Sequence, residues 1–244
     1  MNDLTLDIRN KNLLVIPDLH IPYHHPDAFR WLKKVKSHFK IHMAISLGDE
    51  IDGQSISFHH HSPELASPAD ELNRAIKIIH QKNGLHEQWP ELYLCESNHG
   101  SLYLRRSSKI ASLPAAYMKE YKDIYKTPKW RWASNILLKS NKGLIYCTHG
   151  RSSVALKMAL SEGTSAIQGH YHSRFGINYV KTGSGILFNA FCGSLIDESS
   201  IAFEYGKLNL NKAVLGALRI SKDGSPHLIK MDINKKTNRW SGKL

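Results

Sequence analysis

The chain contains no long hydrophobic run. No window of its 244 residues approaches the roughly 18 uninterrupted apolar residues of a membrane-spanning helix. Its first twelve residues mix charges of both signs, so we expect no signal peptide. Cysteine is scarce: Cys95, Cys147 and Cys192 are far apart and form no CxxC pair, which argues against a disulfide framework. We therefore expect a soluble cytoplasmic protein with buried free thiols and no membrane partner.

Acidic residues are outnumbered, with 21 Asp and Glu against 33 Lys and Arg, and the formal net charge is +12. This excess favours anionic partners such as phosphates, nucleotides or nucleic acid, or it serves solubility alone. The hydrophobic content of 41% is enough for a sizeable core, and the length fits one domain over residues 1–244. The 15 histidines suggest metal binding or acid–base chemistry.

Short apolar runs alternate with helical periodicity over the first two thirds of the chain. The predicted strands cover residues 13–16, 43–47, 92–95, 144–148 and 166–168, and the predicted helices cover residues 26–39, 65–82, 102–121 and 154–160. The last third has mainly strand-like runs, at residues 186–191, 213–220 and 227–233. We therefore predict an α/β fold in which a β-sandwich is flanked by helices in a single domain.

Five of these strands run directly into Asp, His or Asn residues. In chain order the segments are Asp18-Leu-His20, Gly48-Asp49-Glu-Ile-Asp52, Ser97-Asn98-His99, Thr148-His149-Gly150 and Gly169-His170-Tyr-His172. Ligands of α/β sheets bind beyond the carboxyl ends of the strands, where such loops converge. Mixed nitrogen and oxygen ligands without cysteine suit Mn, Fe, Zn or similar ions. Two ions about 3.5–4 Å apart can hold a phosphate and activate a bridging water, so we predict a two-metal hydrolytic centre.

In this order, the motifs DxH, GDxxD, NH, H and GHxH resemble those of the calcineurin-like metallophosphoesterases, and they span residues 18–172. The resemblance implies that family's sandwich fold and two divalent metal ions, with Mn²⁺ as first choice and Fe, Zn, Mg, Co or Ni also compatible. The metal ligands that it implies are Asp18, His20 and His172 for the first ion, Asn98, His149 and His170 for the second, and Asp49 as the bridge.

The resemblance also implies two catalytic residues. His99 would protonate the leaving oxygen or stabilise the transition state, a contribution of roughly 10²–10⁴-fold, and Asp52 would orient ligands. The chain has Ser97 and Gly100 where many family members have glycine and an acid, so His99 needs another partner, for which Asp52 is the candidate. Gly53 stands where protein phosphatases of the family often have arginine, which disfavours a phosphoserine or phosphothreonine substrate.

Four side chains near the motifs are candidate substrate contacts: Arg105, Arg106, Arg151 and His60. Guanidinium groups suit phosphate oxygens because their donors form a planar fork. His60 belongs to a run of three histidines, residues 59–61, which we expect in a loop near the mouth of the site. Residues 117–132 combine aromatic and basic side chains, and they either stack a base or form an amphipathic insertion that covers the core.

The short chain and its SNHG motif resemble the small phage-encoded nucleotide phosphatases of the family. We therefore expect a phosphomonoesterase that uses a metal-bridging hydroxide on a small phosphorylated substrate, with nucleoside or deoxynucleoside 5'-monophosphates as first choice. The alternative is a phosphodiesterase or nuclease that acts on nucleic acid with the same centre. A non-catalytic binding module of the same fold is disfavoured, because every expected metal ligand is present.

Overall fold

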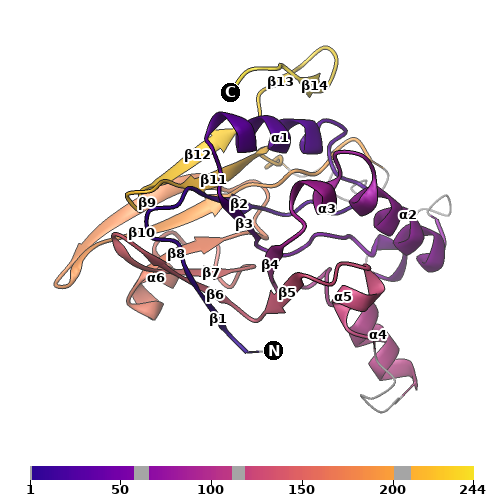
Figure 1. Cartoon of the computed structure of the whole chain (residues 1–244), viewed down its shortest axis with the longest axis horizontal. Helices are drawn as coiled ribbons and strands as arrows, with labels where there is room; N and C mark the ends of the chain where they lie inside the picture. Colours follow the sequence, from indigo (N-terminus) through magenta and orange to yellow (C-terminus); the bar gives the residue numbers. More distant parts are fainter. Residues whose placement is uncertain (1, 58–65, 112–118, 201–209) are drawn as a thin grey trace.

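The computed structural model describes residues 2–57, 66–111, 119–200 and 210–244. Its strands form two six-stranded sheets and one two-stranded sheet (Figure 1). The first sheet has the order β1 (Leu4–Asp7), β6 (Ile136–Ser140), β7 (Gly143–Thr148), β8 (Ser165–Gln168), β10 (Gly185–Cys192) and β9 (Phe175–Thr182). The second has the order β12 (Pro226–Lys230), β11 (Gly216–Ile220), β2 (Leu13–Ile16), β3 (Met43–Ser46), β4 (Leu92–Cys95) and β5 (Trp130–Ala133).

Alternation along the strands explains how the sheets pack. Successive side chains of a strand point to opposite faces of its sheet. In β2, Leu13 and Val15 belong to the core shared with Leu138 and Ile145 of the first sheet, whereas the intervening Leu14 belongs to the core beneath the helices. Both faces of the second sheet are therefore buried, which is why its parallel strands are continuous apolar runs.

Helices cover the outer faces of both sheets. α1 (Ala28–His38), α2 (Pro68–His80) and α3 (Leu85–Gln88) contribute to the apolar core on the outer face of the second sheet. α6 (Lys157–Glu162) packs on the outer face of the first sheet. The predicted α/β class, with a sandwich of sheets flanked by helices, is confirmed.

The predicted and observed structures differ most around residues 102–132, which include the basic and aromatic segment. The helix predicted over residues 102–121 was too long, because α4 (Leu102–Ala111) and the short α5 (Tyr121–Ile124) are separate elements. Tyr121, Tyr125 and Trp130 are 6%, 2% and 1% exposed, and they pack against the core. Their burial favours the core-covering alternative over base stacking, since a stacking platform needs accessible rings.

Two composition-based expectations concern cysteines and membranes. The three cysteines are buried and free, as predicted. Within the described ranges, none of the helices combines the length and the apolar character that crossing a lipid bilayer requires. A small hairpin of β13 (Ile233–Asn234) and β14 (Arg239–Trp240) lies beside α1 near the C-terminus (Figure 1).

Candidate metal centre

The turns after five strands bring all the predicted metal ligands to one place. β2, β3 and β4 run parallel in the second sheet, and β7 and β8 run parallel in the first, so each set of carboxyl ends lies at one edge. A β-bridge between Asp18 and Ser194 joins the end of β2 to the chain that follows β10. The residues after the strands of both sheets therefore meet at a common edge of the sandwich.

The backbone turns sharply at three of these residues. His20, Asp49 and His170 have φ angles of 51°, 48° and 66°, in the left-handed region that non-glycine residues rarely adopt. Gly48, with φ of 100°, begins the turn before Asp49, and a Cβ at this position would lie 2.5 Å from the Cβ of Ser97. Such strained conformations gather at functional sites, where they direct side chains that a regular strand would point elsewhere.

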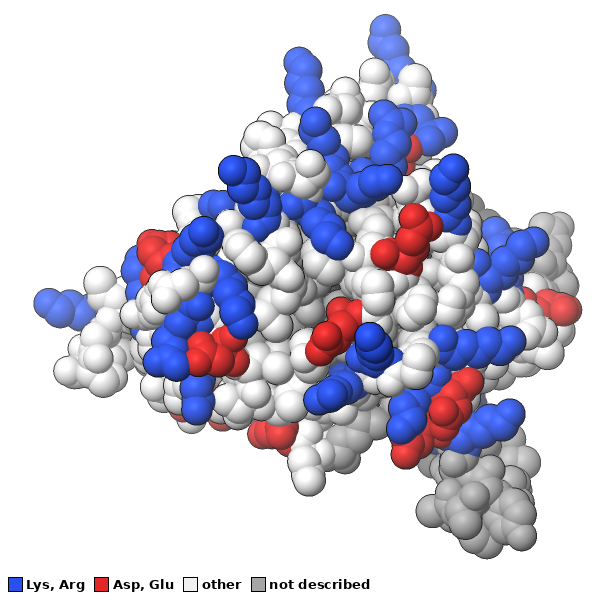
Figure 2. Space-filling view, viewed as in Figure 1, with Lys and Arg blue, Asp and Glu red and all other residues white. Residues whose placement is uncertain are grey.

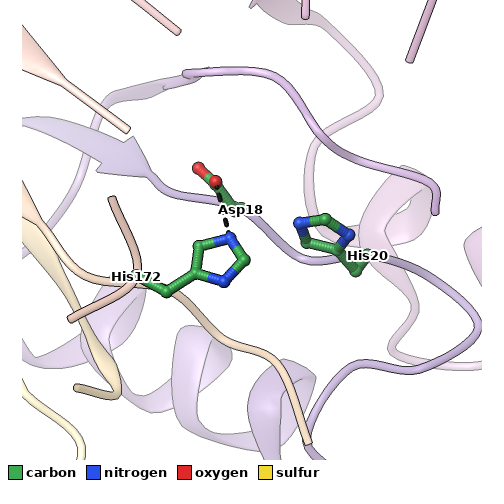
Figure 3. Close-up of side chains that lie close together, drawn as sticks. All are labelled: Asp18, His20 and His172. Atoms are coloured by element: carbon green, nitrogen blue, oxygen red, sulfur yellow. Dashed lines mark hydrogen bonds and ion pairs between the residues drawn. The ribbon is translucent and has the colours of Figure 1, made fainter. Parts of the chain in front are cut away.

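The first group of ligand atoms belongs to Asp18, His20 and His172, which lie within 4.8 Å of one another (Figure 3). The Oδ2 atom of Asp18 is 3.0 Å from Nε2 of His172. The same carboxylate accepts the backbone N–H of His170 at 2.9 Å, which fixes its orientation. The ring of His20 lies edge-on to that of His172, with 5.0 Å between their centroids.

The second group converges on the ring of His149. Its Nε2 atom is 2.7 Å from Oδ1 of Asn98, 3.2 Å from Oδ2 of Asp49 and 3.2 Å from Nδ1 of His170. Its Nδ1 atom is 3.0 Å from the backbone carbonyl of Leu47, a contact that orients the ring and favours a proton on Nδ1. Nε2 faces ligand atoms of three other side chains, and a metal ion bound there would take the place of its proton.

Asp49 lies between the two groups. Its Oδ2 atom is 3.2 Å from Nε2 of His149 and 3.4 Å from Nε2 of His20. Its other oxygen accepts the backbone N–H of His99 at 3.0 Å. The carboxylate is therefore held in one orientation, with one oxygen facing histidines of both groups.

The donor set fits divalent metal ions. Asp18, Asp49 and Asp52 are 0–1% exposed, and a buried carboxylate is costly unless it is paired or bound to a metal. Their ion-pair partners are the histidines His20, His99, His149 and His172. An ion at about 2.0–2.2 Å from its ligands has neighbouring ligand atoms roughly 3.0–3.5 Å apart, which resembles the spacing found around His149 and Asp49.

The charges of these groups stabilise one another without a metal. Burial lowers the pKa of His149, but the charge and hydrogen bond of Asp49 outweigh burial and raise this pKa to about 9. Burial raises the pKa of Asp18 and of Asp49, yet the neighbouring histidines reverse this and hold both pKa values below the usual range. Both carboxylates are therefore ionised at neutral pH, as a metal ligand must be.

His99 has the partner that we expected. Its Nδ1 atom is 2.9 Å from Oδ1 of Asp52 and 2.7 Å from the backbone carbonyl of the same residue. Burial lowers the pKa of His99, but the hydrogen bond with Asp52 and the charge of Asp49 raise it to about 9. The imidazole is therefore protonated at neutral pH, and its side chain is 15% exposed.

Glu50 is a residue of the site that sequence reasoning missed. Its side chain is fully buried, and Oε1 accepts a hydrogen bond from Nε1 of Trp132 at 3.1 Å. A Cβ on Gly100 would lie 3.1 and 3.2 Å from its carboxylate oxygens and 2.7 Å from Oγ of Ser97. The same Ser97 Oγ accepts the backbone N–H groups of Asp49 and Gly100. Ser97 and Gly100, which differ from the usual family residues, thus pack together with Glu50. The sequence feature that could have identified Glu50 is its position inside the GDxxD motif.

A pocket of about 580 Å³ opens beside the second group, and Asn98, His149, His170 and Arg151 contribute to its lining. Nη2 of Arg151 donates to Oδ1 of Asn135 at 3.3 Å. The other two predicted arginines contact the chain itself. Arg105 donates to the backbone carbonyl of Asn98 at 2.6 Å, and Arg106 donates to that of Ile56 at 3.1 Å. His60 lies outside the described residues.

Comparisons with known proteins add a likeness of fold. No protein-family model and no curated protein sequence matches the chain. Vps29 from Chaetomium thermophilum is 15% identical, with 96% of this chain and 93% of that chain covered and a TM-score of 0.48. Yfce, a phosphoesterase from E. coli, is 14% identical, with 91% and 100% covered and a TM-score of 0.40. A third structure, which carries the name diadenosine tetraphosphatase, is 12% identical, with 94% and 97% covered and a TM-score of 0.44.

Proposed function

We propose that this chain is a phosphoesterase of the calcineurin-like metallophosphoesterase type, which hydrolyses phosphomonoesters with the help of two divalent metal ions. The observation that carries the proposal is the position of Asp49, whose Oδ2 atom lies within 3.4 Å of histidines from both ligand groups. A shared carboxylate between two sets of mixed nitrogen and oxygen donors is the arrangement that a two-metal hydrolytic centre requires.

The ligand groups divide the predicted residues into two sets. Asp18, His20 and His172 would hold one ion, Asn98, His149 and His170 would hold the other, and Asp49 would contact both. When bound, the ions supply Lewis-acid polarisation of the phosphate and a water of lowered pKa. Mn²⁺ is our first choice, because carboxylate and amide oxygens suit it, and the imidazole donors keep Fe and Zn as alternatives.

His99 supplies the proton for the leaving group. The contact between its Nδ1 and Asp52 fixes the orientation of the ring, and the raised pKa keeps the imidazole charged at neutral pH. Nε2 then carries a proton that it gives to the leaving oxygen as the ester bond breaks. Asp52 acts through His99 and through His20, whose Nδ1 atom is 3.3 Å from its Oδ1 atom, so it is a positioning residue.

The substrate that we propose is a nucleoside or deoxynucleoside 5'-monophosphate. The pocket beside Asn98 and His149 has a volume of about 580 Å³, which suits a small molecule. Arg151, which contributes to its lining, is placed to contact a phosphate or a sugar hydroxyl. The nuclease alternative is less favoured, because Tyr121, Tyr125 and Trp130 are buried and cannot stack against bases.

The test is phosphate release from a panel of substrates by Mn²⁺-loaded protein, with chelator-treated protein beside it. The panel contains nucleoside and deoxynucleoside monophosphates, a phosphopeptide and p-nitrophenyl phosphate. Bis-p-nitrophenyl phosphate and single-stranded DNA serve as diesters. We expect metal-dependent release that is fastest from one class of nucleotide. Cleavage of the diesters alone would replace the phosphatase by the nuclease, and no release from metal-loaded protein would contradict both.

A further inference from the structure

A second feature with the chemistry of a binding site lies away from the metal centre, between α1 and the C-terminal segment. A groove of about 450 Å³ is lined by Arg30, Lys33, Lys34, Ser37, Trp240 and Gly242. Three of these side chains are cationic, and none is acidic. In Figure 2, Lys and Arg side chains spread over the upper part of the molecule, where Figure 1 shows α1 and the β13–β14 hairpin.

The neighbouring acid is already neutralised. Asp27, just before α1, accepts hydrogen bonds from Nε and Nη2 of Arg239 at 2.7 and 2.6 Å. It also accepts the backbone N–H of Trp240 at 3.0 Å, so this carboxylate fastens the hairpin to the start of α1. Arg30 is 3.8 Å from it, and its side chain is 67% exposed, which makes this ion pair weak. The charge of Arg30 therefore remains available to a ligand.

Three cations of α1 lie together on the helix surface, whereas the fourth, Lys36, donates to the backbone carbonyl of Gln88 and lies over the ring of Trp89. Arg30, Lys33 and Lys34 are three and four residues apart, the spacing that makes side chains neighbours on a helix. Lys33 donates to the neutral Oδ1 atom of Asn83 at 2.6 Å and has no carboxylate within ion-pair distance among the described residues. The guanidinium of Arg30 lies 5.3 Å from the centroid of the Trp240 ring, a contact that places it over the floor of the groove.

The C-terminal hairpin extends the same positive field. Lys235 and Lys236 are exposed in its turn, and Lys243 is exposed beyond β14. Together with Arg30, Lys33 and Lys34, they make six cations on two neighbouring segments, and several dispersed charges match a polyanion better than a single small anion. Nucleic acid is such a polyanion, because its phosphates repeat about every 3.4 Å along each strand.

We propose that this groove, formed by α1 and the C-terminal segment, binds the sugar–phosphate backbone of nucleic acid. The contacts are made by the lysine and arginine side chains with phosphate oxygens, so binding depends on salt and not on sequence. None of the lining residues belongs to the ligand groups of the metal centre. The proposal is thus independent of the proposed phosphatase activity and goes beyond it.

The test is fluorescence anisotropy of labelled 20-nucleotide DNA, single-stranded and duplex, titrated with the purified protein at several salt concentrations. A gel run afterwards shows whether the DNA is intact. The groove variant combines Arg30→Gln, Lys33→Gln and Lys34→Gln. Its matched control combines Arg131→Gln, Lys139→Gln and Lys181→Gln, which removes the same three charges from exposed positions on β5, β6 and β9. Circular dichroism confirms that both variants fold.

We expect the groove variant to weaken binding by about tenfold or more and to reduce the slope of log K against log salt by about 2–3, since each lost phosphate contact removes roughly 0.7–0.9 from that slope. The control variant should keep nearly the full affinity and slope. Preference for single strand or duplex would define the ligand further and supports the proposal in either case. Equal losses in both variants, or no binding by the unaltered protein at about 50 mM salt, would overturn it. Phosphate release from small substrates should be the same in all three proteins, so a failure here is separate from a failure of the phosphatase.

Discussion

The metal centre has a closed side and an open side, and the two differ in charge. Asp18, Asp49 and Asp52 lie on the closed side and are 0–1% exposed. Asn98 and His170, which are proposed as neutral ligands, are exposed on the open side next to the pocket. Electrostatic attraction is stronger where water is excluded, so in the proposed centre the buried carboxylates would provide most of the affinity for cations. The neutral ligands would leave the positive charge of the ions directed toward an incoming phosphate.

The largest effect should come from a change on the closed side. Asp49→Asn removes the one charge that both ligand groups share, so we expect a loss of activity of roughly 10³-fold and the loss of at least one ion. Phosphate release and metal analysis by mass spectrometry measure the two effects. Asn98→Ala, on the open side, should weaken metal binding less, because it removes a neutral ligand and no charge. Equal metal affinities of the two variants would contradict the division into two sides.

His99→Gln separates proton transfer from metal binding. The glutamine keeps a polar side chain beside Asp52 but has no proton of suitable pKa to give, so kcat should fall by roughly 10²–10⁴-fold. The metal content should change little, because the His99 ring lies edge-on to His20 but takes no part in the Asp18–His172 and Asn98–His149 contacts. The loss should be smaller for a substrate with a good leaving group such as p-nitrophenol. A uniform loss over all leaving groups would argue against proton donation.

Gly100→Ala tests the packed unit on the closed side. The new methyl group would lie 2.7 Å from Oγ of Ser97 and near the carboxylate of Glu50, so the free energy of unfolding should fall by about 1–3 kcal/mol. Gly176→Ala is the control, because a Cβ at that residue would have no neighbouring atom within 4 Å and its backbone is in a strand. Urea unfolding of both variants measures the difference. Equal stabilities would show that residue 100 has room for a side chain.

The pH dependence of stability follows from the same charges. The pKa values of His99 and His149 are raised to about 9 in the folded protein, against an ordinary value of 6.5. Their contribution to stability is therefore complete below about pH 6.5 and is lost as the pH rises through about 9. Metal-free protein should unfold more easily at pH 9.5 than at pH 6.5, and His99→Gln should show a smaller difference. Urea titrations at both pH values measure it, and an equal difference in His99→Gln would contradict the assigned pKa.

The smallest effect is expected at the rim of the pocket. Arg151→Gln should raise KM for a nucleoside monophosphate by roughly tenfold with little change of kcat, because one charge-assisted hydrogen bond to the substrate is lost. Arg105→Gln is the comparison, since that guanidinium is bonded to the backbone carbonyl of Asn98 and should affect metal binding more than KM. Steady-state kinetics distinguish the two. An unchanged KM in Arg151→Gln would remove this residue from the substrate site.

Much of this arrangement could be predicted from the sequence, for a local reason. Buried parallel strands are short apolar runs, so residues 13–16 and 92–95 were located to the residue. The polar residues that follow these runs were brought together as predicted, because parallel strands have their carboxyl ends at one edge. The contact between His99 and Asp52 could be predicted for the same reason, since the two residues follow neighbouring strands.

Other features depend on contacts between distant segments, which periodicity does not reveal. β1 was missed because its pattern is mostly exposed and it forms only by pairing with β6, about 130 residues later. β5 was missed because its aromatic residues suggested a ligand site, whereas Trp130 is part of the core. The burial of Glu50 against Gly100 also required the structure, because a charged residue between two motif positions is ordinarily solvated.

The central claim is that two ions share Asp49, and electron paramagnetic resonance of protein titrated with Mn²⁺ tests it most directly. We predict that the chain binds two Mn²⁺ ions and that the second equivalent replaces the signal of an isolated ion by that of an exchange-coupled pair. Asp49→Asn should abolish the coupled signal. A single bound ion, or two ions whose signals stay independent, would contradict the shared carboxylate and with it the two-metal account.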